Sequence, residues 1–344
     1  MSAPADDRYS RQARFAPLGE AGQARLAAAR VAILGCGAVG GAAAVPLARA
    51  GVGHLRLIDR DLPERSNLPR QLLFDEADVA AGLPKAVAAA RQLGRINSAI
   101  TLEPVVADLT AANAERLLAG VDLIIDGTDN LEARYLANEV ACRTKTPWVH
   151  GGAVGGEGRV LTVIPGRTAC LRCLVPEPPP PGTLPTCETA GIIGPAAMVV
   201  GAVQAAEAIK LIAGRAEATA GRMLACDLWA GEWRSLDLAG LAAEGCPTCR
   251  GGDYPWLEGR LGGRASPLCG REAVQVTAAG NAGPVDLAAL ATRLAGLAAV
   301  TVNPWMLRAE VEPGIRLSIF SDGRAIVEGT RDEARGRTIV ARYL

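Results

Sequence analysis

Short apolar runs alternate with longer segments of helical spacing over the first half of the chain. Runs typical of buried strands lie at 30–34, 55–59, 100–106, 121–126 and 147–150. Segments expected as helices lie between them, at 38–50, 84–93, 110–118 and 131–143, with Thr110 as the expected N-cap of the third. Strands that alternate with helices at such intervals form a parallel sheet covered on both faces. The sequence therefore predicts an α/β fold with a mainly parallel sheet and helices on both faces.

The pattern changes after residue 150. We expect a strand at 158–164, a proline-rich loop at 176–185, an apolar helix at 195–213 closed by Gly214, and two short strands within 222–239. The uncharged stretch Thr189–Ala206 resembles a membrane span in composition. It is at the short end of the spanning range and contains Pro195 and several glycines. We therefore predict a buried helix here, and no membrane as a partner.

A second break, rich in glycine, spans 250–267. Beyond it the pattern predicts a small α+β unit, with strands at 273–277, 307–311, 316–320 and 325–327 and a helix at 286–297. Asp322 and Gly323 between alternating apolar runs indicate a hairpin. A chain of 344 residues has room for two domains. We predict a main domain at 1–250, a linker at 251–263 and a small accessory domain at 264–344.

Composition disfavours several classes of function. The 36 basic and 36 acidic residues cancel, so no overall charge attracts nucleic acid or a membrane surface. Only two histidines occur, His54 and His150, which disfavours histidine relays and histidine metal sites. Residues 1–12 are polar and lack the apolar core of a secretory signal. We expect a cytoplasmic protein whose nine cysteines are reduced, so metal binding or catalysis is favoured over disulfides.

Glycines follow the first expected strand at the spacing of a phosphate-binding turn. Gly35 permits a tight turn, Gly37 lets a phosphate approach the backbone, and Gly40 lets helix and strand pack closely. The helix start adds amide donors and the positive end of a dipole. Asp59 follows the second strand, where a ribose-binding acid is expected. Alone, this motif predicts a Rossmann-like fold and is most often an NAD or FAD site.

Further polar side chains follow the expected strands, and these change the interpretation. Asn67, Arg70 and Gln71 come after the second strand, Lys85 begins the next helix, and 126–130 end a later strand. The carboxyl ends of parallel strands form one edge, where ligands bind in such folds. Either Asp129 or Asn130 caps the following helix, or Asp129 holds magnesium against a nucleotide phosphate, or both. This set indicates a triphosphate site in preference to a dinucleotide site.

Four cysteines form two CxxC pairs, Cys170/Cys173 and Cys246/Cys249. This is the spacing of a structural zinc site with all four positions filled, the alternatives being redox-active dithiols or incidental thiols. Cys187 stands apart in the proline-rich loop, as a nucleophile, a sulfur relay or a spare thiol. The other cysteines are expected to pack as small apolar groups; they are Cys36, Cys142, Cys226 and Cys269.

The joint order of these motifs resembles the ThiF/MoeB/HesA family, the bacterial relatives of ubiquitin-activating enzymes. The resemblance covers about residues 8–250. The matching blocks are Arg8–Gln12, Gly35–Gly40, Gly51–Gly53, Asp59–Asp61, Ser66–Gln71, Gly82–Lys85, Asp126–Asn130, Cys170–Cys173, Thr186–Gly191 and Cys246–Cys249.

The resemblance implies ATP-dependent adenylation of the C-terminal glycine of a ubiquitin-like sulfur-carrier protein ending in Gly-Gly. It implies that Asp61 binds the ribose, that Arg70, Gln71 and Lys85 contact the phosphates, and that Asp129 positions magnesium. Arg11 is expected to reach the site of a neighbouring subunit, which implies a functional homodimer. Sulfur relay at Cys187 would add a sulfur donor as a partner.

Two other functions stay open at this point. An NAD-dependent oxidoreductase would use the glycine turn but leave Arg70, Lys85 and the cysteine pairs without a role. A nonenzymatic zinc-stapled interaction protein would use the nucleotide as a switch only. Residues 264–344 lie outside the resemblance and lack the cysteine-centred loop of the rhodanese domain that some relatives carry there. We expect them to dock a protein partner or to stabilise the main domain.

Overall fold

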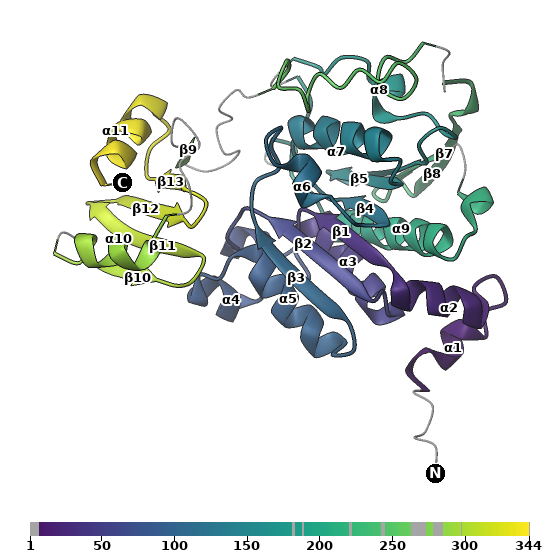
Figure 1. Ribbon diagram of the computed structural model, residues 1–344, viewed down its shortest axis with the longest axis horizontal. Helices are drawn as coiled ribbons and strands as arrows, with labels where there is room; N and C mark the ends of the chain where they lie inside the picture. The colour runs from purple at the N-terminus through teal and green to yellow at the C-terminus, as the bar shows by residue number, and fades with distance from the viewer. Residues whose placement is uncertain are drawn as a thin grey trace. The chain divides into compact units, whose positions relative to one another are not determined.

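The computed structural model describes residues 7–180, 183–187, 189–219, 222–241, 245–262, 273–277, 285–296 and 298–343. The chain divides into two compact units, Met1–Gly262 and Gly263–Leu344 (Figure 1). The predicted packing of Cys269 lies outside the described residues. The helix predicted at 286–297 ends at Leu294, three residues earlier than expected. This division does not test the roles predicted for the main domain and the accessory domain, which stay predictions.

The first unit is built on an eight-stranded sheet of order β3-β2-β1-β4-β5-β6-β7-β8. Its first five strands pair in parallel, and the last three add an antiparallel edge. The strands are β1 (Arg30–Leu34), β2 (His54–Asp59), β3 (Thr101–Val106), β4 (Leu123–Asp126), β5 (Trp148–Val154), β6 (Glu157–Val163), β7 (Arg222–Asp227) and β8 (Glu232–Asp237). This confirms the predicted mainly parallel α/β fold, because the buried apolar runs became the central strands.

Helices cover both faces of this sheet (Figure 1). One core lies under α3 (Ala38–Ala50), α5 (Lys85–Ile96) and α9 (Gly194–Ile212), and the other under α6 (Ala114–Leu117) and α7 (Leu131–Thr144). The shorter helices are α1 (Ser10–Ala13), α2 (Gly19–Ala28), α4 (Glu76–Ala81) and α8 (Leu171–Leu174), with the 3₁₀ turns η1 (Asp7–Tyr9), η2 (Arg65–Asn67), η3 (Ala216–Ala218) and η4 (Ala239–Leu241).

The N-cap prediction at Thr110 is wrong. Helix α6 begins at Ala114 and has Asn113 at its N-cap position. The Asn113 side chain accepts a hydrogen bond from the Thr110 amide at 2.9 Å and donates to the Asp108 carbonyl at 2.8 Å. An asparagine side chain competes well for backbone partners in a turn, so it holds residues 110–113 out of the helix.

Helix α9 is the described helix that has the length and apolar composition of a membrane span. It packs against α3 and against β5 and β6. Ala197, Val200, Ala205 and Ala208 belong to the same buried core as β1 and β2. The apolar character of this helix thus matches its packing beside α3 on the sheet, as expected from the sequence.

Residues 253–262 pack against the first unit, where the sequence favoured a linker. The Trp256 ring stacks on Tyr135 with centroids 5.0 Å apart. The backbone amides of Trp256 and Leu257 donate to Glu139 Oε2 at 3.0 and 2.9 Å. A glycine-rich composition indicates a flexible segment, but a single buried aromatic anchor is enough to hold it.

The second unit is a five-stranded antiparallel sheet of order β10-β11-β12-β13-β9 with two helices. Leu290 of one helix and Ile339 of the other share a core with Leu317 of the central strand. The elements are β9 (Ala273–Thr277), α10 (Leu287–Leu294), β10 (Val300–Val302), β11 (Met306–Glu312), β12 (Ile315–Phe320), β13 (Arg324–Glu328) and α11 (Glu333–Tyr343). This confirms the predicted small α+β unit, to which the structure adds β10 and α11.

Candidate active site

The glycine turn joins the end of β1 to the start of α3. Gly35 has φ +77°, which favours glycine, and its amide donates to the Ile58 carbonyl at 2.8 Å. A Cβ on Gly40 would lie 1.8 Å from the Gly35 carbonyl oxygen. A side chain at Gly40 would therefore separate the helix from the turn. Here the helix N-terminus lies directly behind the turn, the arrangement that binds phosphate.

Asp59 holds the backbone of the glycine turn in place through hydrogen bonds. Its carboxylate is buried and accepts hydrogen bonds from the Cys36 amide and the Asp61 amide, both at 2.7 Å. Burial raises the pKa of Asp59, while the charge of Lys85 and these two amides act to lower it. Both oxygens of Asp59 are thus engaged by the backbone. Asp61, half-buried at the same strand end, is the carboxylate better placed for a ribose.

Lys85 places a buried cation next to this turn. It begins α5, and its side chain is only 7% exposed. Its Nζ lies 3.4 Å from Asp61 Oδ2, and its backbone amide donates to the Asp61 carbonyl at 2.8 Å. Its charge also acts to lower the pKa of the buried Cys36 thiol, which burial raises. The structure therefore brings Lys85, Asp61 and the glycine turn together.

The loop after β2 brings three further predicted residues to this edge. Asn67 is buried and accepts a hydrogen bond from the Glu64 amide at 3.3 Å, so it shapes the loop. Arg70 is half-buried and donates to the Ser66 carbonyl at 2.7 Å. Gln71 is buried beside Gly37: a Cβ added there would lie 3.5 Å from Gln71 Nε2.

The amide oxygen of Gln71 is buried and has no hydrogen-bond partner in the described structure. A buried amide without a partner is costly in a folded protein, typically by about 1–3 kcal/mol. A water, or a ligand group that donates a hydrogen bond, would remove that cost. The other end of the same amide, Gln71 Nε2, lies beside Gly37 and can donate to a phosphate oxygen in the glycine turn.

Asp129 lies on a rigid loop that touches the glycine turn. A Cβ on Gly127 would lie 2.3 Å from the Gly40 amide nitrogen, so the two loops are in direct contact. Asn130 caps α7 by accepting from the Ala133 amide at 2.8 Å, which confirms one of the two predicted caps. Asp129 itself is exposed, and a carboxylate oxygen is a ligand that Mg²⁺ prefers.

A buried network behind this loop escaped the sequence analysis. Asp126 accepts from Thr128 Oγ1 at 2.6 Å and lies 2.9 Å from His150 Nδ1. Burial acts to raise the pKa of Asp126, but the hydrogen bond and charge of His150, the charge of Arg134 and the hydrogen bond from Thr128 together lower it. Gln204 of α9 donates to the Asp126 and Val149 carbonyls at 2.8 and 2.9 Å. The sequence signal that could have revealed this network was Gln204, an amide side chain in a largely apolar helix.

Arg134 of α7 was also missed. Its Nη2 donates to the Thr128 carbonyl at 2.8 Å, so both the amide and the carbonyl of Thr128 are held. Charge from Arg134 acts on Asp126 and on Cys187. Arginine at the first turn of a helix opposes the helix dipole, which is a usable sequence signal for a functional or structural role.

Cys187 lies near the same edge. Its Sγ donates to the Ala153 carbonyl at 3.4 Å, and the side chain is half-buried. Burial raises the pKa of the Cys187 thiol, the charge of Arg70 lowers it and that of Asp129 raises it. These influences place Cys187 in the electrostatic neighbourhood of Arg70 and Asp129. In this state the thiol form is favoured over the thiolate.

Arg11 is the predicted site residue that the chain does not bring to this edge. Gln12, its neighbour in α1, donates to the carbonyl of Ala50 at 3.0 Å, and Ala50 is the last residue of α3. The glycine turn is at the other end of α3. Thirteen helical residues span about 20 Å. Arg11 is exposed and lies roughly one helix length from the nucleotide site of its own chain.

The four predicted metal ligands form one cluster, whose thiols all lie within 4.8 Å of one another. The Sγ–Sγ distances are 3.7 Å for Cys170–Cys246, 3.8 Å for Cys170–Cys173 and 3.6 Å for Cys173–Cys249. Zn–S bonds of about 2.3 Å in a tetrahedron require S–S separations of about 3.8 Å. Disulfides require about 2.05 Å. The cluster therefore fits zinc and excludes disulfide pairing in this arrangement.

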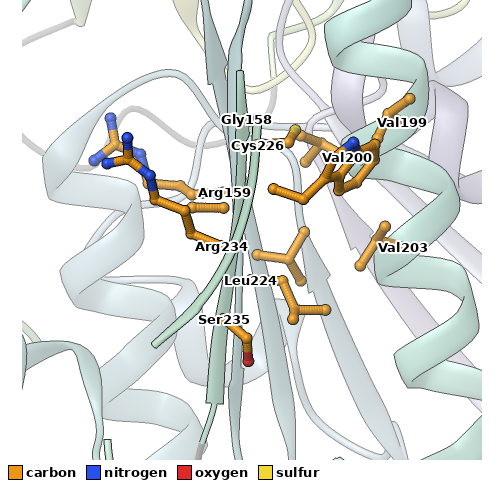
Figure 2. Close-up of a pocket in the computed structure, with 12 residues that line it drawn as sticks. Gly158, Arg159, Val199, Val200, Val203, Leu224, Cys226, Arg234 and Ser235 are labelled. Atoms are coloured by element: carbon orange, nitrogen blue, oxygen red, sulfur yellow. The ribbon is translucent and has the colours of Figure 1, made fainter. Parts of the chain in front are cut away.

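An apolar pocket lies between α9 and the antiparallel edge of the sheet (Figure 2). Its volume is about 230 Å³, and Val203 of α9 lies across it from Leu224 of β7 (Figure 2). The Arg159 and Arg234 side chains extend away from it, on the other side of the strands (Figure 2). Trp233 lines the pocket and is 64% exposed, and the nearby Trp229 is 84% exposed. Exposed tryptophans beside an apolar pocket are typical of a protein-binding surface.

Comparison with known proteins agrees with this geometry. The ThiF family matches residues 9–248. The sulfur carrier protein ThiS adenylyltransferase of Bacillus subtilis is 41% identical over 98% of this chain and 99% of that protein. The SAMP-activating enzyme E1 of Haloferax volcanii is 39% identical over 73% of this chain and 92% of that protein.

Solved structures with the same fold include Escherichia coli MccB crystallised with ATP. That structure has a TM-score of 0.62 and 24% identity, and the match covers 71% of this chain and 75% of that chain. At this identity the likeness bears on the fold alone. The family match and the B. subtilis relative carry the assignment, and this chain belongs to the ThiF family.

Proposed function

We propose that this protein uses ATP to adenylate the C-terminal glycine of a ubiquitin-like sulfur-carrier protein. The observation that carries the proposal is the meeting of the glycine turn with the buried cation of Lys85 and the side-chain amide nitrogen of Gln71. A relative similar over its whole length is named for adenylating the sulfur carrier ThiS, which supports a carrier of that kind.

The chemistry needs charge neutralisation more than proton transfer. The carrier's terminal carboxylate is already ionised, so it needs no base to attack the α-phosphate. A carboxylate oxygen–phosphorus bond forms while the bond from that phosphorus to the bridging oxygen breaks, and pyrophosphate leaves. Lys85 and Arg70 offset the charge on the phosphates, and Asp129 would hold the magnesium that neutralises pyrophosphate. The scarcity of histidine at the strand ends suits this mechanism.

The position of Arg11 supports a homodimer in which each subunit completes the other's site. Arg11 is exposed at the far end of α3 and cannot serve the nucleotide of its own chain. A second copy can bring the same arginine to this edge. We propose that Arg11 contacts the triphosphate bound by the partner subunit.

Cys187 suits a step after adenylation. Its thiol lies near Arg70 and Asp129, but its pKa is raised, so the resting enzyme holds it protonated. We propose that the Cys187 thiolate attacks the carrier's acyl adenylate, forming a thioester while AMP leaves, or that Cys187 takes the outer sulfur of a persulfide donor, which is left as a thiol. Adenylation itself does not need this thiol.

Pyrophosphate exchange tests the central proposal. We expect labelled pyrophosphate to enter ATP only when a carrier ending in Gly-Gly is present, because the reverse reaction needs the acyl adenylate. A carrier shortened by its last two residues is the matched control and should support no exchange. Exchange that proceeds at the same rate without any carrier would contradict the proposal. In the same protein, Mg-ATP should raise the melting temperature and NAD should not.

An NAD-dependent oxidoreductase is not favoured. It would leave Lys85, Gln71 and the cysteine cluster without a purpose. The relatives over most of the chain are named adenylyltransferases or activating enzymes.

We place the globular part of the carrier on the surface around Trp233. The pocket there is lined by β6, which follows β5 in an antiparallel hairpin, and Cys187 bonds to β5. In that hairpin the Gly155 amide donates to the Gly191 carbonyl at 2.8 Å, and the Gly155 carbonyl accepts from the Ile193 amide at 3.0 Å. The next residue, Gly194, lies against Pro69 and Arg70, so this segment links the surface to the nucleotide edge. A carrier seated there can extend its tail toward Asp129.

Replacing Trp233 with serine should raise the carrier KM by about 10-fold or more, as expected for an interface tryptophan. The KM for ATP should not change, since the indole does not reach the glycine turn. Carrier-dependent exchange at varied carrier concentration gives the KM for the carrier, and exchange at varied ATP concentration gives the KM for ATP. Arg234→Ser, on the same strand but directed to the opposite side, is the control and should behave like the wild type. Equal carrier KM values for Trp233→Ser and wild type would place docking elsewhere.

A further inference from the structure

A buried asparagine holds the N-terminal segment in place. Asn97 follows α5 and is 1% exposed. Its Nδ2 donates to Tyr9 Oη at 2.8 Å and to the Ala48 carbonyl at 2.7 Å. Its Oδ1 accepts from Arg8 Nη1 at 2.8 Å and from the Ala99 amide at 3.1 Å. Three of these four hydrogen bonds join residues 8–9 to the last turn of α3, and the fourth holds the loop that follows Asn97.

The Tyr9 ring packs where a glycine leaves room for it. A Cβ on Gly51 would lie 2.5 Å from Tyr9 Cζ, so a side chain at this position would displace the ring. Gly51 has φ +81° and closes α3, so glycine serves both the left-handed turn and the ring. Gly51 of the Gly51–Gly53 block therefore makes room for the Tyr9 ring, which is a role outside the nucleotide site.

Two glutamines complete the attachment. The side-chain amides of Gln12 and Gln23 both donate to the Ala50 carbonyl at 3.0 Å, and Gln12 also donates to Gln23 Oε1 at 2.6 Å. The last carbonyls of a helix have no partner within it, and here they are satisfied by the N-terminal segment. Arg11 lies between the anchored Tyr9 and Gln12, with its side chain exposed.

We propose that Tyr9, Gly51 and Asn97 form a clamp that positions Arg11 for the nucleotide site of a second copy of this chain. We call these three residues the arm clamp. The inference rests on the proposed homodimer and assigns a role to residues outside the catalytic edge. An arginine on an unanchored terminus would lose conformational freedom each time it met a nucleotide. The arm clamp removes that cost in advance, as preorganised sites do.

The arm clamp therefore acts in trans. A defect in it leaves the nucleotide site of its own subunit intact and impairs the site of the partner subunit. A clamp that served only the stability of its own subunit would show the opposite pattern, since it attaches to α3, which begins at that subunit's glycine turn. The two roles differ in which site fails.

Mixed dimers separate these roles. An inert subunit carries Arg70→Ala and Asp129→Ala and is co-expressed under a second tag with an active subunit, so each mixed dimer has one working site. Tyr9→Ala is placed either in the inert subunit or in the active one. Tyr9 is only half-buried, so its loss does not threaten folding, and the melting temperatures of both dimers check this. The two dimers contain the same substitutions in different arrangements.

Carrier-dependent pyrophosphate exchange should fall by about 10- to 100-fold when Tyr9→Ala is in the inert subunit, the scale expected for a misplaced catalytic group. It should stay within about twofold of the unmodified mixed dimer, an estimate for a site left intact, when Tyr9→Ala is in the active subunit. Equal losses in both arrangements, loss only in the second, or no loss in either would overturn the arm clamp.

One further dimer separates this inference from the proposed function. It carries Arg11→Ala in the inert subunit. If its exchange is lost while the Tyr9→Ala dimer is unaffected, Arg11 acts in trans and only the arm clamp fails. If its exchange is unaffected, Arg11 does not act in trans, and the homodimer proposal fails together with the inference.

Discussion

Replacing Cys246 with serine is expected to lower the melting temperature of this protein by roughly 10 °C or more. Structural zinc contributes on the order of 10–16 kcal/mol of apparent folding free energy, comparable with the whole stability of a domain. Losing about 4 kcal/mol of it corresponds to that shift for a unit of this size. The cluster joins residues 170–173 to 246–249, so its loss frees a long connection.

Zinc content and thermal unfolding measure this effect together. The wild type should carry one zinc per chain, and Cys246→Ser should carry less. Cys226→Ala is the matched control, because Cys226 is a buried thiol of β7 outside the cluster. A wild type that holds no zinc after purification with zinc present, or equal melting temperatures for wild type and Cys246→Ser, would contradict the assignment.

Replacing Lys85 with methionine is expected to reduce carrier-dependent pyrophosphate exchange by about 10²–10³-fold, the loss typical of one preorganised charge-stabilising group. Methionine keeps most of the length and apolar body of lysine, so packing at the start of α5 is largely preserved. The cation beside the glycine turn is lost, while the charge that builds on pyrophosphate remains. Loss of the ammonium also leaves Asp61 without the partner it has at 3.4 Å.

Steady-state exchange at saturating carrier and ATP gives this loss as a change in rate. Lys145→Met removes a cation at the exposed end of α7 and is the control, expected to match the wild type. Melting temperatures should stay close for both variants. If Lys85→Met kept its exchange rate within about twofold of the wild type, far less than the loss expected for a charge-stabilising group, the proposed contact of Lys85 with the phosphates would be wrong.

The central strands followed from the sequence because buried parallel strands are continuous apolar runs. Strands β1, β2 and β4 begin and end close to the predicted residues. Helices α4 and α8 were not predicted, since their six and four residues carry little periodic signal. Helix α2, with ten residues, was also missed, because only Gly22 and Leu26 of it are buried. Helix α4 begins with a capping box. The Asp75 side chain accepts from the Asp78 amide at 2.9 Å, and the Asp78 side chain accepts from the Asp75 amide at 3.2 Å. Helix α11 was missed because its apolar residues are few.

The candidate site was predictable as a set of strand ends, and less so residue by residue. The carboxyl ends of parallel strands share one edge, so Lys85, Gln71 and Asp129 were expected to be neighbours. Nothing in the spacing showed that both oxygens of Asp59 hold backbone amides. Nor did it show that Gln204 of a distant helix links β4 and β5. Such contacts depend on how α9 packs across the sheet.

By itself, the sequence determined the α/β class, the phosphate turn, the strand-end polar residues and the paired cysteines. Each of these is encoded in neighbouring residues, through burial pattern, turn chemistry or ligand spacing. Only the tertiary structure decided that the two cysteine pairs meet in one cluster of four thiols and that Arg11 lies a helix length from its own nucleotide site. Both depend on distances between segments far apart in the chain, and these are set by helix length and by packing against the sheet.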